Sequence, residues 1–141
     1  MSEFKATTQP QIYLTVKGGT DAIAFYKSAF NATEEMLMMA DDGTRVMHAT
    51  LGLLGGHIML SDEFPEFDAQ TKSPPVLGGT CVTVHINLAD SAAVDAAMAS
   101  AAAHGATITM PAEQMFWGDY FGRLLDPFGH SWSFAAEISD T

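Results

Sequence analysis

The chain has 141 residues, of which 48% are hydrophobic and 16% charged, and this composition excludes an intrinsically disordered polypeptide. Six Lys and Arg residues against 17 Asp and Glu residues give a net charge of −11, which argues against nucleic acid or an anionic membrane surface as the main partner. The lone cysteine, Cys81, excludes an internal disulfide and a cysteine-based zinc cage, and is compatible with the reducing cytoplasm where we expect the protein. The first residues do not resemble a signal peptide, and no apolar run reaches the ~18–20 residues that cross a bilayer.

The first half of the chain predicts the order strand, helix, strand, strand, strand. Residues Gln11–Val16 are rich in β-branched and aromatic side chains, which is typical of a strand. A helix follows, with Thr20 or Asp21 as its cap and Asn31 as its left-handed end. Its apolar face is formed by Ile23, Tyr26 and Phe30. The three later strands are predicted at Thr33–Ala40, Arg45–Leu53 and His57–Ser61, with a hairpin turn at Asp42-Gly43.

The second half predicts the same order of elements. The first strand is Cys81–Leu88, and Asp90 or Ser91 caps a helix that stops before Gly105. The apolar face of this helix is formed by Val94, Ala97, Met98 and Ala101. The remaining strands are predicted at Ala106–Met110, Tyr120–Leu125 and Ser131–Ala136.

These two halves predict an α+β fold made of two β-α-β-β-β modules. We place the first module at residues 10–64 and the second at residues 80–137, within a single domain that spans residues 1–141. The linker at residues 65–79 contains three prolines and two glycines and is long enough to pass between modules.

The order of elements and six short motifs resemble the vicinal oxygen chelate superfamily, which includes glyoxalase I, the bleomycin-resistance proteins and the extradiol dioxygenases. The resemblance is closest to the PhnB-like branch and runs from about Pro10 to Ala136. The motifs are Tyr13-Leu14, AIAFYKSAF at Ala22–Phe30, His48-Ala49, IMLSDE at Ile58–Glu63, FWGDYFG at Phe116–Gly122 and DPFGHSW at Asp126–Trp132. The resemblance implies curved mixed sheets that face inward around a pocket, outer helices and a homodimer, in some members with modules paired across chains.

Metal-binding members of this superfamily take His, Gln or Glu ligands from the first and last strands of each module. Carried over one position at a time, the first-module ligands fall near Gln11 and Glu63. In the second module they fall on Thr83, with His85 two residues on, and on Ser133, where a metal enzyme has Glu. Since these positions hold at most one strong ligand, we predict no metal and no other cofactor. The alternative is one divalent metal ion at a displaced site formed by His48, His85 and Glu63.

Two histidines are candidate ligand-binding residues. His48 lies on a predicted strand, where it either contacts a ligand or makes a hydrogen bond across the sheet. His85 shares one strand face with Thr83 and Asn87, and this face borders either a pocket or solvent. Ser133, on the last predicted strand, is placed with them through the resemblance.

Phe116, Trp117 and Tyr120 form an aromatic cluster that is either a wall for a flat ligand or core and dimer packing. Relatives often have Arg-Tyr after the Gly-Asp pair, whereas this chain has Tyr120-Phe121, so a cation is lost and the phenol changes face. Arg123 remains as a cation on this strand.

Several other polar residues carry structural interpretations only. We expect Cys81 to be a small buried residue. Asp62 and Glu63 are expected in a solvated turn, and His57, His104 and His130 are expected on the surface.

We therefore predict a metal-free, PhnB-like binding protein that sequesters or recognises an apolar or aromatic small molecule. The predicted ligand-binding residues are His48, His85, Phe116, Trp117, Tyr120 and Ser133. The alternatives are a divalent-metal-dependent lyase, isomerase or dioxygenase of the same superfamily, and a dimeric scaffold with a filled cavity. The expected partners are the small-molecule ligand and a second copy of the chain, with no nucleic acid and no membrane.

Overall fold

The computed structural model describes residues 4–138 and has an α+β fold. The first module comprises β1 (Ile12–Val16), α1 (Gly19–Phe30), β2 (Thr33–Met39), β3 (Val46–Leu53) and β4 (Gly56–Asp62). The second module comprises β5 (Thr83–Asn87), α3 (Ser91–Ala103), β6 (Thr107–Gln114), β7 (Asp119–Leu125) and β8 (Ser131–Glu137). A short helix that the sequence analysis did not predict, α2 (Pro74–Leu77), lies between them.

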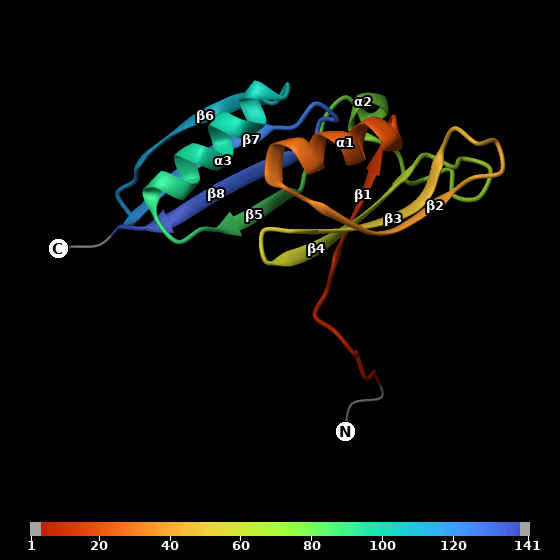
Figure 1. Ribbon diagram of the computed structural model, residues 1–141, viewed down its shortest axis with the longest axis horizontal. Helices are drawn as coiled ribbons and strands as arrows, with labels where there is room; N and C mark the ends of the chain where they lie inside the picture. The colour runs from red at the N-terminus through yellow and green to blue at the C-terminus, as the bar shows by residue number, and fades with distance from the viewer. Residues whose placement is uncertain (1–3, 139–141) are drawn as a thin grey trace.

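Each module forms one four-stranded mixed sheet, and the two sheets have the same plan (Figure 1). The first sheet has the order β1-β4-β3-β2 and the second has the order β5-β8-β7-β6. In each sheet the first strand pairs in parallel with the last, and the other neighbours are antiparallel. The predicted α+β fold with two β-α-β-β-β modules is therefore confirmed.

Helices α1 and α3 contact each other and lie on the same side of the two sheets (Figure 1). The core beneath them joins aromatic side chains of both modules, since the Phe30 ring lies 5.2 Å from Trp132 and 5.6 Å from Phe134. The Ser100 hydroxyl of α3 donates to the Ala29 carbonyl of α1 over 2.6 Å. These contacts hold the modules together on the helical side.

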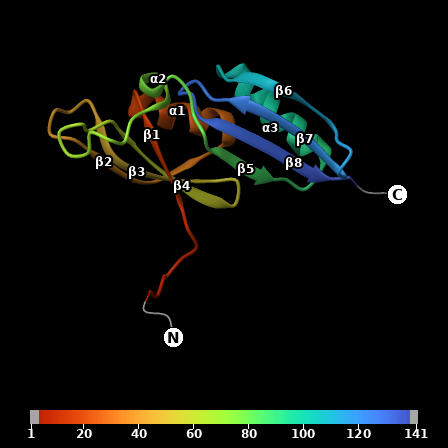
Figure 2. The same cartoon turned by 180° about the vertical axis from the view of Figure 1, so that it is seen from behind.

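Within residues 4–138, the opposite face of both sheets carries no helix, and we call it the bare face (Figure 2). Strand alternation along β1 places the side chains of Leu14 and Val16 in the core. It places Tyr13 on the bare face, where its side chain is 49% exposed. The same alternation buries Val84 and exposes His85 on β5. Polar and apolar side chains therefore share a broad surface on the bare face.

The start of α1 differs from the prediction. Neither Thr20 nor Asp21 caps the helix. The cap residue is Gly18, whose φ of 94° suits glycine and which has no side chain to make a cap hydrogen bond. The Asp62 carboxylate of β4 accepts from the Gly18 and Gly19 amides instead. The expectation of a solvated Asp62 was therefore wrong, because this side chain is only 7% exposed.

Three further expectations can be compared with the structure. Asn31 ends α1 in the left-handed conformation, at φ 57°, as predicted. Cys81 is exposed rather than buried, because β5 begins only at Thr83 and leaves the cysteine in the preceding loop. His130, expected on the surface, is half-buried, and its Nε2 lies 2.9 Å from the Thr15 carbonyl oxygen.

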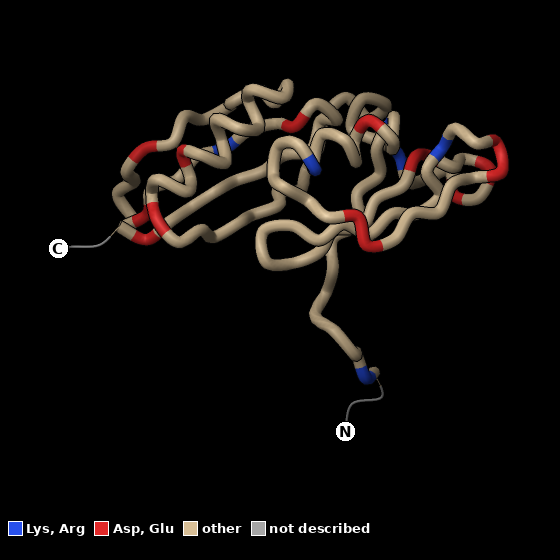
Figure 3. The backbone as a smooth tube through the Cα atoms, viewed as in Figure 1, with Lys and Arg blue, Asp and Glu red and all other residues tan. Residues whose placement is uncertain are grey.

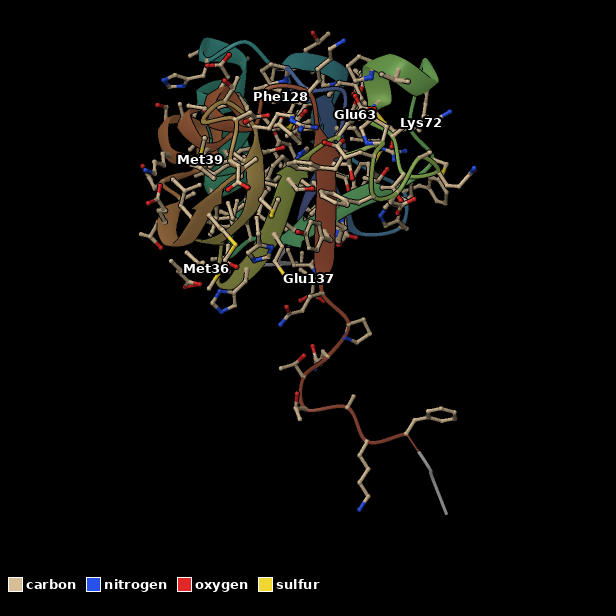
Figure 4. The ribbon with its side chains drawn as sticks, turned by 90° about the vertical axis from the view of Figure 1, so that its right-hand side faces the viewer. Met36, Met39, Glu63, Lys72, Phe128 and Glu137 are labelled. Carbon is tan, nitrogen blue, oxygen red and sulfur yellow. The ribbon has the colours of Figure 1, made fainter. Side chains whose placement is uncertain are left out.

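The chain segment before β1 runs away from the sheets as an extended arm (Figure 4). Met36 and Met39 lie on β2, at the edge of the first sheet away from β1 in this view.

Acidic residues outnumber basic ones along both modules (Figure 3). Within residues 4–138, none of the helices is long and apolar enough to cross a membrane.

Candidate ligand-binding site

A row of polar side chains crosses the bare face of the second sheet. His85 of β5 lies opposite Ser133 of β8, and the distance between His85 Nδ1 and Ser133 Oγ is 2.7 Å. The other ring nitrogen, Nε2, lies 2.9 Å from Asn87 Oδ1. An amide oxygen only accepts, so Nε2 donates, and in the neutral imidazole Nδ1 accepts from the Ser133 hydroxyl. The ring is thus fixed in orientation on both sides.

Aromatic side chains border this row. The His85 ring stacks on Phe121 of β7 with 6.2 Å between ring centroids. Trp117 lies 5.7 Å from Phe121, and Phe116 lies 5.0 Å from Trp117. The Trp117 indole donates to Asp119 over 3.1 Å, while Phe116 is 97% exposed. The rings of Phe116, Trp117, Phe121 and His85 are therefore in continuous contact, and we call the three aromatic side chains the aromatic wall. Their edge-to-face and stacked contacts are the geometries in which aromatic rings also contact a flat ligand.

Tyr120 does not lie with this wall, although the sequence analysis grouped them. Its hydroxyl donates to Asp95 of α3 over 2.6 Å, on the helical face of β7, and this hydrogen bond raises the pKa of the phenol. Alternation along β7 instead places Phe121 and Arg123 on the bare face. Phe121 was not among the predicted site residues, although the alternation that removes Tyr120 from the bare face also predicts Phe121 there.

A second polar group continues the row toward the other end of β5. The Thr83 and Ser131 hydroxyl oxygens are 2.9 Å apart across the β5–β8 pair. Arg123 Nη2 donates to Thr83 Oγ1 over 2.6 Å. Arg123 also lies opposite Ser133 in the β7–β8 pair, so the serine is flanked by an imidazole on one side and a guanidinium on the other.

His48 lies on the bare face of the first sheet, in a separate cluster. The Tyr13 hydroxyl is 2.8 Å from His48 Nδ1, and His48 Nε2 is 3.0 Å from Thr50 Oγ1. Met38 of β2 lies opposite His48 and is 50% exposed. Within residues 4–138, no hydrogen bond or ring contact joins this cluster to the His85 row. The structure therefore divides the predicted ligand-binding residues between two sheets.

Cavities adjoin both bare faces. One of about 290 Å³ runs from Tyr13 and Thr15 to Phe64 in the loop after β4. Another of about 400 Å³ lies beside Asn87 and Ala135 at the end of the His85 row. Volumes in this range are at the lower end for small-molecule sites. A third, of about 670 Å³, lies away from both clusters and is lined by prolines and glycines of the linker and the β7–β8 turn.

The residues present do not fit a resident divalent metal ion. In the part of the chain that the structure describes, no three His, Cys, Asp or Glu side chains gather as a ligand set. Both nitrogens of His48 and of His85 already have hydrogen-bond partners. Glu63 accepts from the Ser73 amide over 3.1 Å, and Gln11 is exposed in the segment before β1.

Comparisons with known proteins agree with this fold. The family model of the Glyoxalase/Bleomycin resistance protein/Dioxygenase superfamily matches residues 8–134. The uncharacterized protein Mb0911c of Mycobacterium bovis is 37% identical over 129 residues, which cover 91% of this chain and 82% of that protein. The gene product AT5G48480 of Arabidopsis thaliana superposes with a TM-score of 0.71 at 28% identity, covering 92% of this chain and 99% of that one. A PhnB protein from Bacillus cereus superposes with a TM-score of 0.71 at 20% identity, covering 92% of this chain and 99% of that one.

Proposed function

Since the chain belongs to the Glyoxalase/Bleomycin resistance protein/Dioxygenase superfamily, we propose that it is a PhnB-like, metal-free member that binds a small apolar or aromatic molecule. The observation that carries this proposal is the aromatic wall of Phe116, Trp117 and Phe121 beside the polar row of His85 and Ser133. The protein would sequester or recognise its ligand in the cytoplasm.

The wall and the row have complementary tasks. Aromatic side chains provide most of the contact area for a flat ligand, because stacking and burial of apolar surface both favour association. A few fixed polar groups then select its orientation. His85 suits this second task, since its partners Ser133 and Asn87 hold the ring in one orientation before a ligand arrives.

The test uses 2-naphthamide, a flat neutral aromatic probe, with isothermal titration calorimetry on the full chain. We expect saturable binding that Trp117→Ala weakens about tenfold, in line with the loss of one aromatic contact and its buried area. His85→Ala is expected to weaken binding as well. The control is His104→Ala, at the exposed end of α3, which should bind as the wild type does. Absence of binding to 2-naphthamide and to related flat aromatics would overturn the proposal.

The competing function is a metal-dependent lyase, isomerase or dioxygenase, as in other members of the superfamily. Elemental analysis of protein purified without chelator separates the two. About one equivalent of a transition metal per chain, lost in His85→Ala, would support the enzyme and contradict the metal-free proposal.

We also propose that the bare faces are covered by a second copy of this chain. On the first sheet, Tyr13 of the edge strand β1 and Met36 and Met38 of the opposite edge strand β2 expose about half of their surfaces. A single chain leaves these side chains in water, which disfavours the monomer. A two-fold partner that sets its second sheet over this first sheet would cover them and bring the His48 cluster of one chain toward the His85 row of the other.

Light scattering after size-exclusion chromatography tests the dimer. We expect twice the mass of one chain for the wild type and a shift to the monomer for Met38→Glu, because the new charge would be buried in the interface. The control is Ala96→Glu, on the exposed surface of α3, which should remain dimeric. A monomeric wild type at micromolar concentration would contradict this proposal.

A further inference from the structure

Arg123 has an unusual electrostatic position for this chain. The sequence contains two arginines, and the other, Arg45, forms ion pairs with Asp42 and Glu66 at 2.8 and 2.7 Å. Within residues 4–138, Arg123 has no carboxylate oxygen within 4.0 Å, and its one side-chain partner is the Thr83 hydroxyl. Among the residues that the structure describes, the one arginine of the second module therefore has no acidic partner, although the sequence contains 17 acidic residues.

This cation is also half-buried in the middle of a sheet, where removing a charge from water is costly unless a counter-charge compensates. A guanidinium has five N–H donors in a planar fork that matches the two oxygens of a carboxylate. Thr83 takes one of these donors, so the fork retains the capacity for a bidentate contact.

The surroundings of Arg123 are those of an anion site with an adjoining aromatic surface. Ser133 lies directly opposite on β8, and Thr83 and Ser131 form a hydroxyl pair beside the guanidinium. Phe121 is two residues away on the same strand and face, a spacing of about 6.5–7 Å along β7. The Phe121 ring is also the one that stacks on His85.

We infer that the bare face of the second sheet binds an aromatic carboxylate, with its ring against Phe121 and Trp117 and its carboxylate on the guanidinium of Arg123. The inference rests on the proposed binding function and names the chemical class of the ligand. Arg123 supplies the specificity for an anion, while the aromatic wall supplies affinity for the ring. The Ser131 hydroxyl lies beside the guanidinium and donates to a carboxylate oxygen when the Thr83 hydroxyl donates to it, whereas the Ser133 proton is already used by His85.

The experiment compares 2-naphthoate with 2-naphthamide, which has the same ring and nearly the same shape but no charge. We expect the wild type to bind the carboxylate at least tenfold more tightly than the amide, as a charge-assisted bidentate contact allows. Arg123→Gln should remove this preference, so that the carboxylate binds no more tightly than the amide. Arg123→Lys should retain part of it, since the charge stays but the fork is lost. The matched control is Lys17→Gln, which removes the same charge at an exposed position beyond β1 and should leave the preference intact.

The outcomes separate this inference from the proposed function. Equal affinity of the wild type for the two compounds would overturn the inference and leave the binding function standing. Failure to bind either compound would overturn both. If Arg123→Gln converts a dimer to a monomer and leaves the carboxylate preference unchanged, the anion on Arg123 belongs to a second copy, and the inference is overturned. Thermal unfolding of Arg123→Gln and of Arg123→Lys without ligand shows whether each variant is folded for these comparisons.

Discussion

Replacing Asp126 with alanine is expected to lower the free energy of unfolding by about 3–5 kcal/mol, because two buried donors lose their acceptor. Asp126 lies in the β7–β8 turn and is 4% exposed. Its Oδ2 accepts from the Tyr26 hydroxyl and from the Trp132 indole, the latter over 2.9 Å. Its Oδ1 accepts from the Phe128 and His130 amides over 2.9 and 3.0 Å. Chemical denaturation with urea measures the change.

The size of this effect follows from where the donors lie. Tyr26 and Trp132 are both fully buried, so water cannot replace the lost carboxylate without opening the core between the modules. Burial, with the charge of Asp126 as the second cause, holds the pKa of Tyr26 well above 10. The phenol therefore keeps its proton at neutral pH and remains a donor that needs an acceptor.

Two controls accompany the alanine variant. Asp126→Asn retains one carbonyl oxygen and is expected to lose less stability than Asp126→Ala. Asp41→Ala removes an exposed acid from the turn after β2 and should change the unfolding free energy by no more than about 0.5 kcal/mol. A loss of less than about 1 kcal/mol for Asp126→Ala would show that the network contributes little to the packing of the two modules.

Much of the fold follows from local patterns. Period-two alternation, the hairpin turn at Asp42-Gly43 and the left-handed Asn31 are all determined by nearby residues, and the strands and helices lie within a few positions of their predicted bounds. The start of α1 was not predictable in this way. Its acceptor comes from Asp62, 44 residues after Gly18, and only the pairing of β4 with β1 brings the two together.

In the candidate site, too, some features follow from nearby residues and others depend on contacts between distant parts of the chain. Alternation along β5 predicts that Thr83, His85 and Asn87 share a face, and the structure places all three on the bare face. The pairing of His85 with Ser133 depends on the parallel register of β5 and β8, which no local pattern specifies. The separation of His48 from the His85 row depends in turn on how the modules pack, and that arrangement is determined by the aromatic core beneath the helices.

Replacing Asp62 with alanine is the second change for which we expect a large effect, a loss of about 3 kcal/mol in the free energy of unfolding. The Asp62 carboxylate accepts from the amides of Gly18, Gly19 and Val46 at 2.7–3.0 Å, so it joins the start of α1 to β3. It also places a negative charge at the positive end of the helix. Asp90→Ala is the matched comparison, because Asp90 caps α3 through a single exposed hydrogen bond from Ala93 and should cost about 1 kcal/mol.

Gly19 gives this prediction a sharper form, because a Cβ at this position would lie 2.6 Å from Asp62 Oδ2 and 2.7 Å from Val46 Cβ. Gly19→Ala should therefore destabilise the wild type strongly, since Val46 Cβ is attached directly to the backbone and Asp62 Oδ2 is held by the Gly19 and Val46 amides. In the Asp62→Ala background one of the two overlaps is gone, so the same substitution should cost less. The double-mutant cycle, measured by urea denaturation, should then give a coupling between the two positions of about 1 kcal/mol or more. Additive losses would mean that the carboxylate does not pack against Gly19, and that α1 is held at its start by Val46 and the core alone.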